Sequence, residues 1–222
     1  MKAQYIKRTG SDTLTLFFAG WGMDSVPFAD HTGGGDLLLL YDYTDLTFDT
    51  ELTDGYRHYR VAAWSMGVWA ASCVVPGLGL DISESVAVAG TSTPVSERFG
   101  IPPVIFDGTL AGLNDRSLAS FRRRMCGGAA AASVFERCAP ERDIESLREE
   151  LRSIGEMSAV KTGSMRWDRA VVTMRDAIFP AGAQIAAHTR DGAGIVTEID
   201  VPHYHRETLR DIIEGRCWIK SV

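Results

Sequence analysis

The sequence predicts an α/β fold in which a mostly parallel, doubly wound sheet carries an inserted helical segment. Three observations lead to this prediction: short apolar runs typical of buried strands, helical stretches that alternate with them, and a long middle region with helical signals only. The length of 222 residues suits one domain with an insertion.

The strands are predicted from apolar runs that lack polar alternation, as in parallel sheets buried on both faces. These runs are residues 14–19 (LTLFFA), 37–41 (LLLLY), 60–64 (RVAAW), 85–89 (SVAVA), 169–173 (RAVVT) and 194–199 (GIVTEI). A shorter and weaker run at 184–187 is also interpreted as a strand.

Helices are predicted between these runs. Residues 66–75 are small and apolar and end at Pro76, and residues 206–214 form a C-terminal helix. Residues 143–154 place Ile and Leu at helical spacing, with Asp143 near the start and Gly155 after the end. Residues 109–167 contain no convincing strand, so we expect a helical lid within a single domain that covers residues 1–222.

Composition and charge exclude several classes of protein. With 45% hydrophobic and 23% charged residues, the composition excludes a wholly disordered chain. The net charge of −6 excludes a strongly basic nucleic-acid-binding protein. Residues 61–80 carry no charge, but Ser, Gly and Pro interrupt them, so we interpret them as a buried strand and helix, not a membrane span. The first twelve residues lack the apolar core of a signal peptide, so we expect a cytoplasmic location.

Cysteine and histidine spacing does not indicate a metal site. The four cysteines are Cys73, Cys126, Cys138 and Cys217, and their spacing contains no zinc-site pattern. We expect them to be reduced and buried. A His-x-His pair near the C-terminus has no third ligand indicated, so we expect neither a metal nor a cofactor.

The predicted chemistry centres on Ser65, which lies between a buried strand and a helix of small residues. This is the setting of a nucleophile elbow, usually written Gly-x-Ser-x-Gly, whose small neighbours keep the strained turn free of clashes. Gly67 fits the pattern, and Ala63 stands where the first glycine is usual. The alternative is a plain strand end at which Ser65 caps the following helix.

A nucleophilic serine needs a histidine base and a carboxylate that orients the histidine. In this type of fold the acid and then the histidine follow the serine along the chain. His203 and His205 both follow the last predicted strand, and His203 is preferred because an aromatic residue follows it. Asp176 follows the strand at 169–173 and is the preferred acid, ahead of Asp191 and Asp200. The alternative for Asp176 is an Asx turn at a strand end.

An oxyanion hole requires two backbone amides near the nucleophile. One is predicted to be that of Met66, directly after the serine, and the other that of Trp21, between Gly20 and Gly22. A dinucleotide-binding loop is excluded because Ser25 stands where the third glycine is required.

Several blocks together resemble the BioG-type pimeloyl-[acyl-carrier protein] methyl ester esterases. They are residues 17–23 (FFAGWGM), 64–69 (WSMGVW), 100–102 (GIP), 106–110 (FDGTL) and 202–204 (PHY). The resemblance implies an α/β-hydrolase of biotin synthesis that removes the methyl ester masking the ω-carboxyl of a carrier-bound pimeloyl chain. It implies Ser65 as nucleophile, His203 as base and the Trp21 and Met66 amides as oxyanion hole, and it supports Asp176 less directly.

The implied partner is an acyl carrier protein, which is acidic, whereas this chain also has a negative net charge. A local basic surface is therefore needed, and Arg122, Arg123 and Arg124, with Arg116 nearby, are the candidates. The alternative is a solvated basic helix face. Two other functions stay open: another serine carboxylesterase or thioesterase, and a non-catalytic protein of the same fold.

Overall fold

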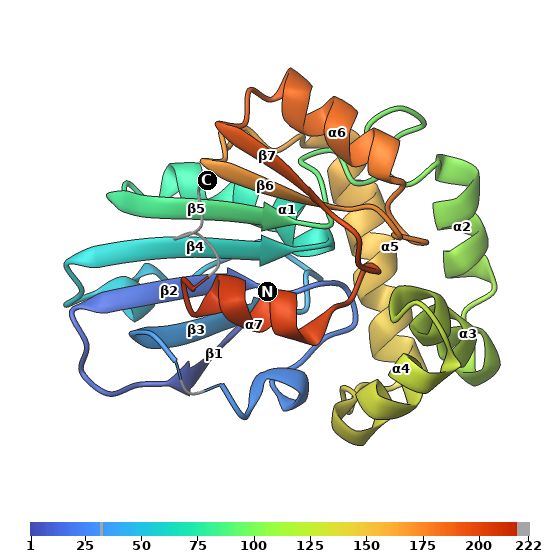
Figure 1. Ribbon diagram of the computed structural model, residues 1–222, viewed down its shortest axis with the longest axis horizontal. Coiled ribbons are helices and arrows are strands. Elements are labelled where there is room, and N and C mark those ends of the chain that lie inside the picture. The colour runs from blue at the N-terminus through green and yellow to red at the C-terminus, as the bar shows by residue number, and fades with distance from the viewer. Residues whose placement is uncertain (32, 217–222) are drawn as a thin grey trace.

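The computed structural model describes residues 1–31 and 33–216, in which helices cover a seven-stranded sheet (Figure 1). The strands are β1 (Lys2–Lys7), β2 (Thr13–Phe18), β3 (Asp36–Tyr41), β4 (His58–Trp64), β5 (Ile82–Val88), β6 (Arg169–Thr173) and β7 (Ile195–Ile199). The α-helices are α1 (Met66–Val74), α2 (Pro103–Ala111), α3 (Asp115–Met125), α4 (Ala129–Phe135), α5 (Ile144–Val160), α6 (Ala181–Arg190) and α7 (Arg206–Ile213). Short 3₁₀ turns cover Val26–Phe28, Thr50–Thr53, Val75–Gly77 and Glu136–Cys138.

The sheet is mostly parallel, as the sequence predicts. Its strand order is β1-β3-β2-β4-β5-β6-β7, and β1 pairs antiparallel with β3 while the other neighbours pair in parallel. Parallel strands all end at one edge of the sheet, which is where active sites of open α/β folds are built. The predicted fold class is confirmed.

Burial on both faces explains the unbroken apolar runs. In β2, Leu14, Leu16 and Phe18 pack into one core with residues of α1 and α5, whereas Phe17 packs into a second core with residues of α7. Both sides of the strand are therefore removed from water, so no alternation with polar residues appears.

The prediction of a strand at 184–187 is wrong, because these residues lie in α6. The sheet has no room for another strand here, since β6 pairs directly with β7. A four-residue apolar run does not distinguish a strand from a buried helix. The alanine-rich segment after Pro180 is a good helix former, which decides the outcome.

The prediction that a helix ends before Gly155 is also wrong, because α5 continues to Val160. The start is as expected, since the Asp143 side chain accepts a hydrogen bond from the Ser146 amide. A Cβ at position 155 would lie 2.9 Å from the Phe106 ring. Glycine here permits close packing between α2 and α5 and does not mark the end of the helix.

The helical segment predicted over 109–167 contains α3, α4 and α5, together with the end of α2, which starts earlier, at Pro103. These helices lie between β5 and β6 in the chain and beyond the edge at which β2, β4 and β5 end (Figure 1). Within residues 1–31 and 33–216, no helix is both long and apolar enough to cross a membrane. Cys73, Cys126 and Cys138 are free thiols, and Cys217 lies outside the described residues.

Candidate active site

Ser65 occupies the sharp turn that connects β4 to α1. Its φ of 60° and ψ of −128° lie in a region that non-glycine residues rarely adopt, and its amide donates to the Val88 carbonyl oxygen at 2.9 Å. Such strain is typical of functional sites. The Ser65 side chain makes no capping hydrogen bond to α1, so the structure does not show the plain helix cap considered from the sequence.

Small residues surround this turn because the backbone passes close on several sides. A Cβ at Gly67 would overlap the Phe18 carbonyl oxygen, and a Cβ at Gly90 would overlap the Ser65 carbonyl oxygen. Ala63, by contrast, is fully buried within β4 without a glycine being needed there. Gly90 was missed in the sequence because it lies far from Ser65 along the chain and belongs to no recognised motif.

His203 and Asp176 lie next to Ser65 in a hydrogen-bonded row. His203 Nε2 is 2.9 Å from Ser65 Oγ, and His203 Nδ1 is 2.7 Å from Asp176 Oδ2. The histidine and aspartate side chains are almost completely buried, at 1% and 0% exposed. An ionised carboxylate only accepts hydrogen bonds, so it places the imidazole proton on Nδ1 and leaves Nε2 to accept from the serine hydroxyl.

Two aromatic residues hold the His203 ring in place. The Trp64 indole N–H donates to the His203 carbonyl oxygen at 2.9 Å, and the Phe179 ring is stacked against the imidazole with a centroid distance of 6.0 Å. One contact therefore holds the backbone of His203, and the other packs against the face of its imidazole ring.

Asp176 lies in the loop after β6, where its two oxygens have different partners. Oδ1 accepts from the Ile178 and Phe179 amides, each at 2.8 Å, which is an Asx-type turn. Oδ2 accepts from Thr173 Oγ1 at 2.7 Å and from Gln184 Nε2 at 3.0 Å, besides facing His203. The turn and the contact with histidine thus occur together and are not alternatives.

The side chains considered as the alternative base and the alternative acids have other partners. His205 caps the N-terminus of α7 and is 2.9 Å from the Glu207 carboxylate. Asp191 pairs with Arg190 at 2.6 Å, and the Asp200 side chain is 83% exposed. Among the described residues these three make no hydrogen bond to Ser65 or His203.

The loop between β2 and β3 passes directly beside the serine. A Cβ at Gly20 would lie 3.1 Å from the Ser65 Cβ, so the backbone approaches the turn very closely. In the described part of the chain the backbone amides of Trp21 and Met66 donate to no protein acceptor. The Trp21 indole N–H donates to the Leu147 carbonyl oxygen at 2.9 Å, which ties this loop to α5.

A buried carboxylate, Glu150, fixes the same loop and was missed in the sequence. It accepts from the Gly22 and Tyr43 amides, each at 3.1 Å, and from Arg142 at 2.6 Å. Complete burial raises the pKa of Glu150 to about 7, although Arg142 lowers it. A signal did exist: Glu150 lies within the apolar stripe of α5, one position before Leu151.

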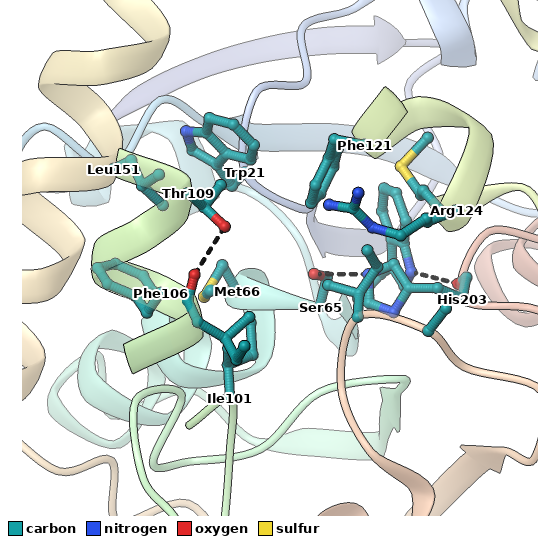
Figure 2. A pocket seen from close by; sticks show the side chains of 15 residues that line it. Trp21, Ser65, Met66, Ile101, Phe106, Thr109, Phe121, Arg124, Leu151 and His203 are labelled. Carbon is teal, nitrogen blue, oxygen red and sulfur yellow. Dashed lines mark hydrogen bonds between the residues drawn. The ribbon is translucent and has the colours of Figure 1, made fainter. Parts of the chain in front are cut away.

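A cavity of about 450 Å³ opens above Ser65 and His203 (Figure 2). Its lining is mainly apolar, and its residues are Trp21, Trp64, Ser65, Met66, Ile101, Ile105, Phe106, Thr109, Phe121, Arg124, Met125, Leu151, Ala177, Ile178 and His203. Phe121 and Arg124, both from α3, extend into this cavity, and among the described lining residues Arg124 is the one permanently charged side chain. Such a cavity suits an apolar chain with few polar groups.

The three consecutive arginines of α3 do not form one patch, because successive helical residues point about 100° apart. Arg122 pairs with Glu136 at 3.1 Å. Arg123 is exposed on the side of α3 that faces α4, whereas Arg124 is directed to the cavity above Ser65.

A metal centre is not formed by the residues that the structure describes, since no three His, Cys, Asp or Glu side chains gather to hold an ion.

Both a protein family and curated proteins match this chain over most of its length. The family model described as pimeloyl-ACP methyl esterase BioG matches residues 1–211. The chain is 42% identical over 198 residues to a malonyl-[acyl-carrier protein] O-methyltransferase from Bacteroides fragilis, covering 88% of this chain but 40% of that relative. It is 38% identical over 208 residues to an uncharacterised protein from Haemophilus influenzae, covering 92% of this chain and 94% of the relative.

Solved structures agree with these matches. BioG from Haemophilus influenzae superposes with a TM-score of 0.83 at 34% identity, covering 94% of this chain and 96% of that structure. A lipase-esterase related protein from Clostridium acetobutylicum has a TM-score of 0.62 at 10% identity, over 96% of this chain and 98% of the other, and shows the fold alone. The chain belongs to the BioG family of pimeloyl-ACP methyl esterases, carboxylic ester hydrolases with the α/β-hydrolase fold.

Proposed function

We propose that this chain hydrolyses the methyl ester of pimeloyl-[acyl-carrier protein] methyl ester in biotin synthesis by a Ser-His-Asp acyl-enzyme mechanism. The observation that carries this proposal is the row of Ser65, His203 and Asp176 at an apolar cavity, in a chain of the BioG family. The apolar lining suits the hydrocarbon part of a pimeloyl chain.

In the first step Ser65 Oγ attacks the carbonyl carbon of the methyl ester, and His203 Nε2 takes the hydroxyl proton. Asp176 holds the imidazole orientation and stabilises the imidazolium that forms. The oxyanion accepts hydrogen bonds from the Trp21 and Met66 amides, which have no protein acceptor in the described chain. Methanol then leaves with the proton that His203 returns.

In the second step water attacks the acyl-enzyme. His203 takes a proton from the water, and the tetrahedral intermediate collapses to release the free carboxylate and the Ser65 hydroxyl, which regains its proton from His203. The two steps together convert a methyl ester and water to a carboxylic acid and methanol.

The carrier-bound nature of the substrate is supported by the family and by one relative. The name of the Bacteroides fragilis protein describes a methyltransferase that acts on an acid bound to an acyl carrier protein. Such a reaction forms a methyl ester, which is the kind of bond that we propose this chain hydrolyses. We propose that the exposed arginines of α3 (Arg116, Arg123 and Arg124) attract the acidic carrier, while Arg122 is already paired with Glu136.

The helices above the cavity are proposed to act as its lid. Phe106 and Thr109 from α2, Phe121 from α3 and Leu151 from α5 all line the cavity. Movement of the segment 109–167 and the start of α2 would therefore change access to Ser65.

Labelling with a fluorophosphonate probe tests the nucleophile. The wild-type protein is expected to form a stable covalent adduct at Ser65, because an activated serine attacks phosphorus, and Ser65→Ala is expected to form none. Circular dichroism of the variant checks that it is folded. Equal labelling of the two proteins, or no labelling of the wild type, contradicts the proposed role of Ser65.

A further inference from the structure

A second cavity lies between α2 and α3 and adjoins the first. Its volume is about 510 Å³, and it shares Ile105, Thr109, Phe121 and Arg124 with the cavity above Ser65. The two spaces therefore lie next to each other on either side of these four side chains, and we call the second one the α2–α3 groove.

The α3 side of the groove is basic. Arg116, Ser120 and Arg124 lie four residues apart, so they form one stripe about 12 Å long on the same helix face. The described residues that line the groove include no Asp or Glu. No described side chain pairs with Arg116 or Arg124. The face of α3 toward α4 differs, because Asp115 and Glu136 lie there beside Arg122 and Arg123.

The α2 side of the groove is apolar and open. Val104 is 71% exposed and Ile105 is 58% exposed, which is unusual for large apolar side chains. A Cβ at Gly108 would have no heavy atom within 4 Å, so nothing in the protein fills the space above this position. An apolar wall facing a cationic stripe suits a ligand that is both partly apolar and anionic.

We propose that the α2–α3 groove holds the phosphopantetheine arm of the carrier-bound substrate and that Arg116 binds its phosphodiester. This inference rests on the proposed function. With the methyl ester at Ser65, the hydrocarbon chain fills the first cavity and its thioester end must leave through an adjoining opening. Arg124 lies at the junction, and Arg116 lies farther along the groove, where the phosphate at the distal end of the arm arrives.

The chemistry of the arm matches the two walls. Its branched apolar carbons can pack on Val104 and Ile105, and its amides can hydrogen-bond to Ser120. The phosphodiester carries a permanent negative charge, for which an exposed guanidinium supplies a charge-assisted hydrogen bond.

The phosphate contact is tested with two synthetic substrates, the methyl pimeloyl thioesters of phosphopantetheine and of pantetheine. Arg116→Ala is expected to lower kcat/KM about 10-fold for the phosphorylated thioester and much less for the other, because only the former offers the phosphate. Arg152→Ala is the control, since Arg152 is an exposed arginine on α5 that lines neither cavity. Equal losses on both thioesters overturn the role of Arg116.

The path of the arm is tested by filling the groove. Gly108→Leu is expected to raise KM several-fold more for the pantetheine thioester than for dimethyl pimelate, which has no arm. Gly182→Leu is the matched control, because Gly182 is also a helical glycine with open space around it. Equal effects of Gly108→Leu on the two substrates overturn the path, whereas a wild-type protein inactive on every pimeloyl methyl ester refutes the proposed function itself.

Discussion

At the scale of single residues, Gly90 determines whether the turn at Ser65 can form. A Cβ there would overlap the Ser65 carbonyl oxygen, so Gly90→Ala must shift the serine backbone. Misplacement by about 1 Å can cost roughly 100-fold in rate, so we expect a loss of kcat/KM of that order on methyl esters. Gly77→Ala is the control, because a Cβ at position 77 would have no heavy atom within 4 Å. Wild-type kinetics in Gly90→Ala would show that the turn tolerates a side chain.

Glu150 links the pH dependence of stability to the loop between β2 and β3 that contains Gly22. Its pKa rises from 4.5 to about 7 on folding, so the folded state binds its proton more tightly than the unfolded state does. Through this residue the free energy of unfolding is therefore higher below pH 4.5 than above about pH 7, and the difference is lost as pH rises through about 7. Arg142, which pairs with Glu150 and with Asp42, limits the rise in the pKa of Glu150.

We therefore expect Glu150→Gln to flatten the dependence of Tm on pH between about 4.5 and 7. The variant should also be less stable at neutral pH by about 1–3 kcal/mol, because the glutamine NH2 group would face donors in either orientation: the Tyr43 amide, or the Gly22 amide and Arg142. Glu149→Gln, at the exposed neighbouring position, is the control. Identical Tm profiles for Glu150→Gln and the wild type would contradict this account.

At the scale of elements, α3 presents different arginines to different partners. Arg123 is exposed and does not line the cavity above Ser65. Arg123→Glu is expected to raise KM for carrier-bound substrate about 10-fold at low salt, because an acidic partner is repelled, while turnover of dimethyl pimelate stays near wild type. The same reversal at Arg152 serves as control. A similar loss on both substrates would argue against docking on this helix.

The elements that the sequence predicts well are those with strong local signals. The turn at Ser65 needs small residues at nearby positions, so it leaves a recognisable motif. The run at 184–187 and the end of α5 at Gly155 were predicted wrongly, because only tertiary contacts decide them: the direct pairing of β6 with β7, and the Phe106 ring against Gly155.

Residues that act through distant contacts leave weaker signals in the sequence. Glu150 and its exposed neighbour Glu149 are the same residue type, and they differ only in the face of α5 on which they lie. Its role depends on Gly22 and Tyr43, which are more than one hundred positions away along the chain. Asp176 and His203 were predictable as candidates, but only the fold brings them to Ser65.

At the scale of the whole molecule, the sheet brings the proposed catalytic residues together, and the inserted helices line the cavity above them. Ser65, Asp176 and His203 follow β4, β6 and β7, so all three lie at the same edge of the sheet. The helices α2, α3 and α5 contribute Ile105, Phe106, Phe121, Met125 and Leu151 to the apolar lining above them. The chain spans nearly all of the Haemophilus influenzae BioG structure but 40% of the Bacteroides fragilis relative.

The most direct test of this account follows the two ends of one substrate, pimeloyl-[acyl-carrier protein] methyl ester. Methanol release and the integrity of the thioester are measured together by mass spectrometry, with wild type and Ser65→Ala. We predict that the wild type releases methanol and leaves pimeloyl-carrier protein intact, and that Ser65→Ala releases none. Cleavage of the thioester in place of the methyl ester, or undiminished methanol release by Ser65→Ala, would contradict the account.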